Sequence, residues 1–304
     1  MKSRSLLVAV AAVLVAVGFG QLRKTGANGT AEPDQTKPGQ TKVEGLVAVD
    51  PKNFDRPTQI DNKWFPFKPG TRFTYEGFAM EEGKKIPRRF IATVTDLTKV
   101  VGGVRSVVGF DRDYSDGELV EAELIFFAQD NDGNVWHLGE YPEEYEGGKL
   151  VATPAWLHGF EDAKAGFMMM ADPKLGTPSY PQGWGPAVGW TDRGSVYQVG
   201  QKTCVPADCY ENVLVISETS HSEPDAYQLK YHAPGVGVIR VGWRGRGEKI
   251  QETLELVKVE QLSPEALAKE RAQALELEKR AYKNSKNVYA HTSPAEPMPG
   301  AKGQ

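Results

Sequence analysis

The sequence has few of the residues and motifs on which most enzyme and metal sites depend. Its 304 residues include two cysteines and five histidines. It contains no G-x-S-x-G, HExxH or phosphate-binding glycine motif. Lysine and arginine (36 together) form no basic stripe, and the formal net charge of −4 argues against nucleic-acid binding. These absences favour a non-catalytic binding protein and give no reason to expect a cofactor.

The two cysteines, Cys204 and Cys209, are separated by four residues that are typical of a hairpin tip, Pro206 and Asp208 among them. An even number of cysteines in an exported chain predicts a disulfide. Closing so small a ring should stabilise the fold by about 2 kcal/mol. A redox or metal site is the alternative, but no histidine adjoins the pair.

The N-terminus is typical of a bacterial export signal. Lys2 and Arg4 precede the apolar run Leu6–Phe19, which is short for a membrane span, and Gly20 suits a cleavage site. No cysteine follows that run, which disfavours a lipid anchor. We therefore predict a signal peptide over 1–20 and a secreted or periplasmic protein whose mature chain has no membrane span. An uncleaved N-terminal anchor is the alternative.

Composition predicts where the folded part begins and ends. Residues 21–49 are polar and rich in Gly, Pro, Thr and Gln, which predicts a disordered linker. A β domain is expected over 50–262. Ser263-Pro264-Glu265 then has the signature of a helix start, so we predict a C-terminal helix over 263–284. Residues 285–304 are expected to be a disordered tail.

Residues 50–262 alternate between polar and apolar in runs rich in β-branched and aromatic side chains, which predicts strands. Turn dipeptides separate several of these runs, for example Asp116-Gly117. The fold class that follows is mainly β: a curved, twisted antiparallel sheet, a half-barrel-like meander, with one C-terminal α-helix. The runs are 88–95, 104–114, 119–129, 134–140, 194–199, 210–217, 227–232, 236–243 and 249–259.

Two Pro-Gly turns, Pro69-Gly70 and Pro234-Gly235, each lead into an alternating run. We interpret these runs as the opening and closing strands of one antiparallel sheet. The stretches 62–77, 130–136 and 231–237 resemble a group of exported bacterial proteins of unassigned function, in which FPxKPGT…YEG, DxDGNVW and YxAPGVG motifs recur. The resemblance implies an exported β-rich domain and no catalytic residues. The last motif is also similar to a strand of curved-sheet envelope proteins that hold apolar ligands.

The segment 141–192 breaks the alternation and carries three of the six tryptophans, together with Met168–Met170. A long irregular insert within a domain is often functional. We predict that it lines a cleft for an apolar or aromatic small molecule or a lipid. Copper binding by the methionines is the alternative, but three consecutive residues cannot face one side. The predicted ligand-binding residues are His137, Trp156, Met169, Trp184, Trp190 and His232.

Other patterns support competing hypotheses. His158 with Glu161 or Asp162 could serve a hydrolytic or metal-assisted enzyme, although no second histidine follows at i+4. The acidic run 111–117 superficially suggests a calcium loop, but it lacks the glycine and glutamate spacing and is better explained as a hairpin end. A third hypothesis is a structural or protein-interaction module. The ligand, the oligomeric state and the convergence of the histidines are open at this stage.

Overall fold

The computed structural model describes residues 43–298. The predicted signal peptide at 1–20, residues 21–42 of the predicted linker and the last residues of the tail lie outside the described residues. Within 43–298, no helix is long and apolar enough to cross a membrane.

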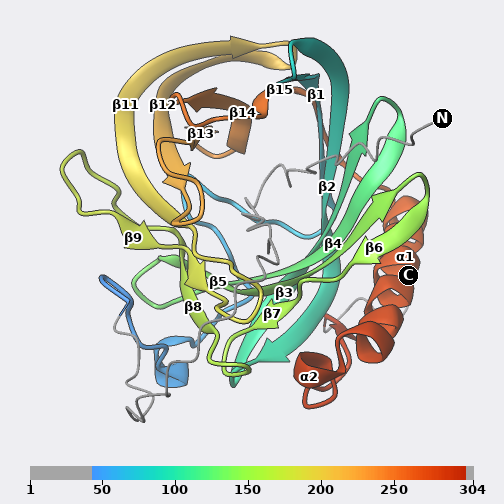
Figure 1. Cartoon of the computed structure of the whole chain (residues 1–304). Helices are drawn as coiled ribbons and strands as arrows, with labels where there is room; N and C mark the ends of the chain where they lie inside the picture. The colour runs from blue at the N-terminus through green and yellow to red at the C-terminus, as the bar shows by residue number, and fades with distance from the viewer. Residues whose placement is uncertain (1–42, 299–304) are drawn as a thin grey trace, which may run out of the picture.

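The strands form one large, open antiparallel sheet that curves strongly (Figure 1). Along its main path the strand order is β5-β4-β3-β2-β1-β15-β14-β13-β12-β11. This confirms the predicted mainly β fold. The bounds are β1 Thr71–Glu81, β2 Lys84–Val101, β3 Val104–Ser115, β4 Glu118–Gln129, β5 Val135–Glu146, β11 Arg193–Val205, β12 Asp208–Thr219, β13 Tyr227–Ala233, β14 Gly237–Arg244 and β15 Gln251–Gln261.

The predicted turn dipeptides produce the hairpins. Asp116 and Gly117 both have positive φ angles, 50° and 82°, as a two-residue turn between β3 and β4 requires. The acidic run 111–117 is therefore a hairpin end and not a calcium loop. Alternation along β3 and β4 then gives the sheet two apolar faces, one on each side.

The opening and closing strands belong to the same sheet, as expected. β1 pairs with β15, and Phe73 lies opposite Val259. The turn between β13 and β14 is tied to the loop before β1, because Gly235 N donates a hydrogen bond of 2.7 Å to Lys63 O. Two segments far apart in the sequence are thus held together at one end of the sheet.

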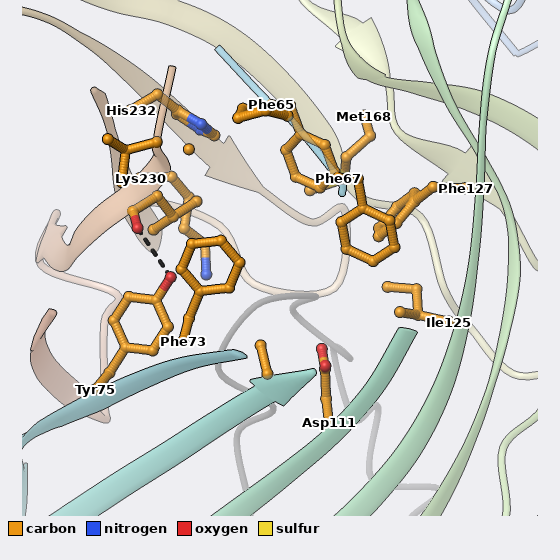
Figure 2. A pocket seen from close by; sticks show the side chains of 15 residues that line it. Phe65, Phe67, Phe73, Tyr75, Asp111, Ile125, Phe127, Met168, Lys230 and His232 are labelled. Atoms are coloured by element: carbon orange, nitrogen blue, oxygen red, sulfur yellow. Dashed lines mark hydrogen bonds between the residues drawn. The ribbon is translucent and has the colours of Figure 1, made fainter. Parts of the chain in front are cut away.

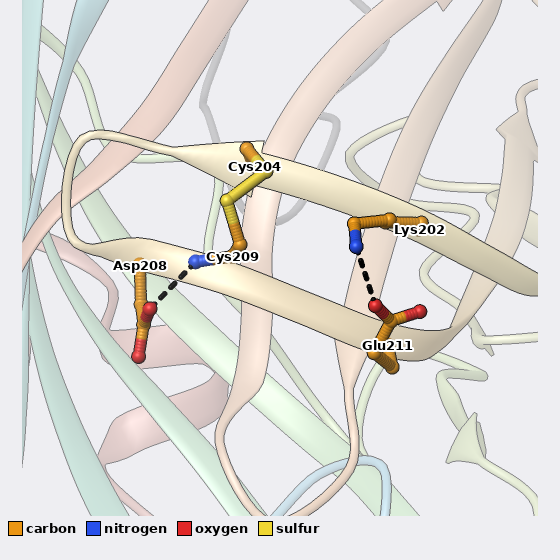
Figure 3. Close-up of a disulfide and its surroundings, with 5 residues drawn as sticks. All are labelled: Lys202, Cys204, Asp208, Cys209 and Glu211. Atoms are coloured by element: carbon orange, nitrogen blue, oxygen red, sulfur yellow. Dashed lines mark hydrogen bonds and ion pairs between the residues drawn. A yellow bond between two sulfur atoms is a disulfide. The ribbon is translucent and has the colours of Figure 1, made fainter.

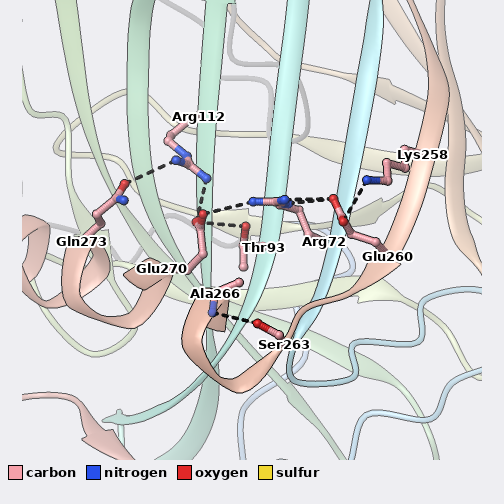
Figure 4. A network of polar contacts seen from close by, with 9 residues as sticks. All are labelled: Arg72, Thr93, Arg112, Lys258, Glu260, Ser263, Ala266, Glu270 and Gln273. Carbon is pink, nitrogen blue, oxygen red and sulfur yellow. Dashed lines mark hydrogen bonds and ion pairs between the residues drawn. The ribbon is translucent and has the colours of Figure 1, made fainter. Parts of the chain in front are cut away.

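Helix α1 (Pro264–Asn284) lies along the outside of the curve, beside β2 to β4 (Figure 1). Ser263 Oγ caps it by accepting a hydrogen bond from Ala266 N, as predicted. The helix buries Leu277 and two alanines against the outer face of the sheet. Glu270 anchors it through Arg112 at 2.6 Å and Arg72 at 3.4 Å (Figure 4).

The chain after α1 differs from the sequence prediction of a disordered tail from 285. Its described part forms helix α2 (Lys286–Tyr289) and strand β16 (Glu296–Pro297), which pairs with β2. The reason is burial: the ring of Tyr289 is fully buried. Ala295 N also donates hydrogen bonds of 3.0 Å to the carboxylate of Glu278.

Residues 141–146 of the expected irregular insert continue strand β5, and the rest of 141–192 forms short strands joined by turns. They extend both edges of the sheet: β8 pairs with β5, while β9 pairs with β11. β10 returns to pair with β8, so the segment from Tyr180 to Trp184 contacts both edges. The bounds are β6 Lys149–Ala152, β7 Trp156–Leu157, β8 Lys164–Met169, β9 Tyr180–Pro181 and β10 Gly183–Trp184.

Candidate functional site

An aromatic cavity lies on the face of the sheet opposite α1 (Figure 2). Its walls come from the loop before β1, from β1, β3 and β4, and from β13 and β14, with Met168 of β8 at one side. The free volume is about 50 Å³, so a ligand longer than a few methylene groups would have to displace a ring. The aromatic lining residues are Phe65, Phe67, Phe73, Tyr75, Phe127 and His232.

Asn62 fixes the loop that carries two of these rings. Its Oδ1 accepts hydrogen bonds from Trp64 N at 2.8 Å and Phe65 N at 3.2 Å. Its Nδ2 donates to Gly133 O at 2.9 Å and to Met170 O at 3.2 Å. Because one buried amide ties the loop both to the β4–β5 turn and to the end of β8, the loop's rings are held over the sheet.

The rings meet edge to face. The centroid of Phe127 lies 5.0 Å from that of Phe65 and 5.2 Å from that of Phe67, with interplanar angles of 75° and 85°. His232 closes one side, and its Nδ1 lies 3.1 Å from Trp64 O. Burial lowers the pKa of His232 to about 4, so the imidazole is neutral at neutral pH and belongs to the apolar wall.

Three polar side chains, Tyr75, Lys230 and Asp111, also line the cavity. Tyr75 donates a hydrogen bond of 2.8 Å to Val238 O. Lys230 Nζ lies 3.8 Å from Glu218 Oε2, and Glu218 Oε1 accepts 2.6 Å from Gln182 Nε2. Asp111 lies on β3, where burial raises its pKa to about 7. The cavity is therefore amphipathic, with an apolar body and ionisable groups in its wall.

The predicted ligand-binding residues are distributed between this cavity and the core beside it. His232 lines the cavity, as does Met168, the neighbour of the predicted Met169. His137, Trp156 and Trp190 pack on one another behind Phe127, with ring centroids 4.8 to 5.2 Å apart. Met169 is fully buried, and Trp184 is half-buried at β10. A binding role for these remaining residues stays a prediction.

The histidine at 158 does not meet its predicted partners. His158 is half-buried, and its Nδ1 accepts a hydrogen bond of 3.2 Å from Ala165 N. Glu161 and Asp162 are exposed in a turn, with φ angles of 48° and 60°. Among the hydrogen bonds and ion pairs of residues 43–298, none joins His158 to either carboxylate. His158 also lies outside the cavity that His232 lines.

His137 has a different neighbour, Glu140. Its Nε2 lies 3.5 Å from Glu140 Oε2, and both side chains are fully buried. Burial lowers the pKa of His137 to about 3 and raises that of Glu140 well above its usual range. Burial therefore favours the uncharged form of both side chains. Residues 43–298 contain no group of three or more His, Cys, Asp or Glu side chains arranged to hold a metal ion.

The disulfide is present at the tip of the β11–β12 hairpin, as predicted (Figure 3). Cys204 and Cys209 are directly opposite each other. Asp208 Oδ1 accepts a hydrogen bond of 2.7 Å from Cys209 N, and Lys202 pairs with Glu211 beside the bridge. A disulfide fits an extracytoplasmic location. It lies at the sheet edge and outside the cavity lining.

Sequence reasoning did not single out the phenylalanines of the cavity. Part of the cavity could have been predicted from the sequence, because alternation along 119–129 places Ile125 and Phe127 on one face of the strand. Phe65 and Phe67 could not be assigned in this way, since they lie in a loop whose fold depends on Asn62. The buried carboxyls of β3 to β5, considered below, were also not recognised.

No protein-family model matches this sequence, and no curated protein matches it. Two solved structures are similar in fold: a Bacteroides fragilis protein described as exported, with a YmcC-like fold, and a Parabacteroides distasonis protein described as a lipoprotein. The TM-scores are 0.40 and 0.38. Each is 13% identical to this chain, and each match covers 66% of this chain and 99% of the other. These values are too low for any functional conclusion.

Proposed function

We propose that this protein is an exported, non-catalytic binding protein that holds an apolar ligand in the aromatic cavity. The observation that carries the proposal is the lining: phenylalanines from the loop, β1 and β4 converge on one space. Ligand sites are concave and mostly apolar, with a few polar groups that orient the ligand. The cavity matches this description, with Lys230 and Asp111 as its polar groups.

The 141–192 segment has a supporting role in this proposal. Met168 contributes to the wall, and a flexible thioether suits ligands of variable shape. Trp156 and Trp190 pack behind His137 and keep the wall in place. The cleft proposed here is therefore centred on Phe127 and not on the tryptophans.

Binding of 1-dodecanol, followed by isothermal titration calorimetry, tests the proposal. We expect Phe67→Ala to strengthen dodecanol binding, because it removes a ring that a long chain would have to displace. Ala92→Leu should weaken binding, because it fills part of the cavity. Phe78→Ala is the matched control, since Phe78 alternates to the other face of β1. Equal dodecanol affinity in the parent and both cavity variants would overturn the proposal, as would no binding to the parent.

A further inference from the structure

A row of six carboxyl groups lies beside the cavity on the same face of the sheet, and one of them, Asp111, also lines the cavity. Side chains two residues apart on a strand share a face. Ile125 of β4 lines the cavity, so Glu123 and Glu121 follow it on that face. We call the row the acidic patch: Asp111, Asp113, Glu121, Glu123, Glu140 and Glu144. All six are buried, with at most 6% of each residue exposed.

Strand register places the acids of this patch directly against one another. Asp111 lies opposite Glu123, and Asp113 lies opposite Glu121. Glu121 is also opposite Glu144 on its other side. Like charges directly opposite in neighbouring strands destabilise a sheet. A fold that places them there needs something to compensate their charge.

The arginine and lysine side chains near the patch are fewer than its acids, although Arg112 also acts on Asp111 and lowers its pKa. Arg88 contacts Asp113 at 3.0 Å, but the same guanidinium contacts Glu252 and Glu81. Lys230 lies 3.8 Å from Glu218, an acid outside the patch. His137 lies near Glu140, but its pKa of about 3 leaves the ring uncharged. The acids therefore outnumber the positive charges around them.

Several carboxyl oxygens of the patch have no hydrogen-bond partner within the described part of the chain. They are both Oε atoms of Glu140, one Oε atom each of Glu123 and Glu144, and one Oδ atom of Asp113. Glu140 is 0% exposed and Glu123 is 2% exposed. A buried polar atom without a partner is costly, and a buried charge is costlier. The indole N–H of Trp156 lies near Glu140 and can serve one of these atoms, and a positively charged hydrogen-bond donor would suit the others.

We propose that the ligand of the aromatic cavity is a cationic amphiphile, whose apolar chain occupies the cavity and whose ammonium head lies against the acidic patch. This inference rests on the proposed function. An ammonium has three donors and no strict coordination geometry, so it suits carboxyls spread along neighbouring strands. Burial also raises the pKa values of Glu121, Glu123 and Glu140, so the head group would compete with protons for these carboxyls.

The test compares three probes with the same chain, each below its micelle concentration: dodecylamine, 1-dodecanol and dodecanoate. Calorimetry on the full mature chain at neutral pH should give an amine affinity at least about tenfold above that of the alcohol. Dodecanoate should bind most weakly, because its charge is repelled. Added salt should weaken binding of the amine more than binding of the alcohol.

Two variants test whether the preference for the amine over the alcohol depends on the acidic patch. Glu123→Gln combined with Glu140→Gln keeps the shape of both side chains and should bring the amine affinity down to that of the alcohol. The exposed Glu118→Gln on the same strand is the matched control and should change neither. Thermal melting of each variant checks folding, and Glu123→Gln alone provides a second test if the double variant fails to fold.

The failure of this inference can be distinguished from that of the proposed function. If 1-dodecanol binds and the amine binds no tighter, the cavity is a ligand site and the cationic head group is wrong. If dodecanoate binds most tightly, Lys230 holds the head group and the inference is overturned. If none of the three probes binds, both proposals fail. An amine preference that survives the double Gln variant overturns the role of the patch.

Discussion

The rings of Phe127 and His137 lie 5.2 Å apart, centroid to centroid, and join the cavity to the tryptophan core. On one side Phe127 contacts the cavity rings; on the other, His137 lies 4.8 Å from Trp156 and 5.2 Å from Trp190. The wall of the cavity is thus the surface of a continuous aromatic core. Substitutions of Trp156 or Trp190 should therefore lower the free energy of unfolding more than they change ligand affinity.

Trp156→Ala should lower the free energy of unfolding by about 3 to 5 kcal/mol, because the indole is 2% exposed and packs on two other rings. Urea denaturation gives the value. Trp184→Ala, at a half-buried position on β10, should cost clearly less. Equal costs for the two tryptophans would show that the ring contacts of Trp156 contribute little.

Stability should rise as the pH falls from about 8.5 to 6.5. Burial raises the pKa of Asp111 and of Glu144 to about 7 and that of Asp113 to about 8. An acid with a raised folded-state pKa binds its proton more tightly when folded, so the stability it contributes is present at low pH and lost as the pH rises through that value. Below 6.5 the buried His137 and His232, whose pKa values are lowered, act in the opposite direction.

Melting temperatures measured across this window check the sign. For Asp111 the whole effect is at most about 4 kcal/mol, but it extends from about pH 4 to about pH 7, so about 1 kcal/mol of it falls within this window. Asp111→Asn should flatten the curve, whereas Asp116→Asn, in the exposed hairpin turn, should leave the slope unchanged. A melting temperature that rises from pH 6.5 to 8.5 would contradict the assignment of these buried carboxyls.

Glu270→Ala should loosen α1 from the sheet and cost about 3 kcal/mol, because it leaves Arg72 and Arg112 without their shared buried partner (Figure 4). Chemical denaturation measures the loss. The matched control is Glu276→Ala, which breaks an exposed pair with Lys279 on the same helix and should cost less than about 0.5 kcal/mol. Similar losses in both variants would argue against an anchoring role for Glu270.

Replacing both cysteines by serine should lower the free energy of unfolding by about 2 kcal/mol, since the bridge closes a short loop. Dodecanol affinity should not change, because neither cysteine lines the cavity. The melting temperature of the parent with and without reductant gives an independent measure. A loss of binding in the folded double variant would show that the hairpin tip reaches the ligand.

Features that depend on local interactions could be predicted from the amino-acid sequence. Alternation of side chains predicted the strands, the Asp116-Gly117 turn predicted a hairpin, and Ser263 marked the start of α1. The bridge between Cys204 and Cys209 also followed from local spacing. Each of these features depends on backbone preferences or contacts within a few residues, which a single sequence displays.

Only the tertiary structure showed where the site lies, because convergence depends on pairs that are distant in sequence. His232 meets the loop at Trp64 across 168 residues, and Asn62 reaches Met170 across 108. The acids that face one another on β3 to β5 could not be predicted for the same reason. Alternation indicates which face of the sheet a residue lies on, but only strand register shows which residue lies opposite it. The curvature that brings β13 and β14 over β3 and β4 sums many small strand twists, which no local pattern encodes.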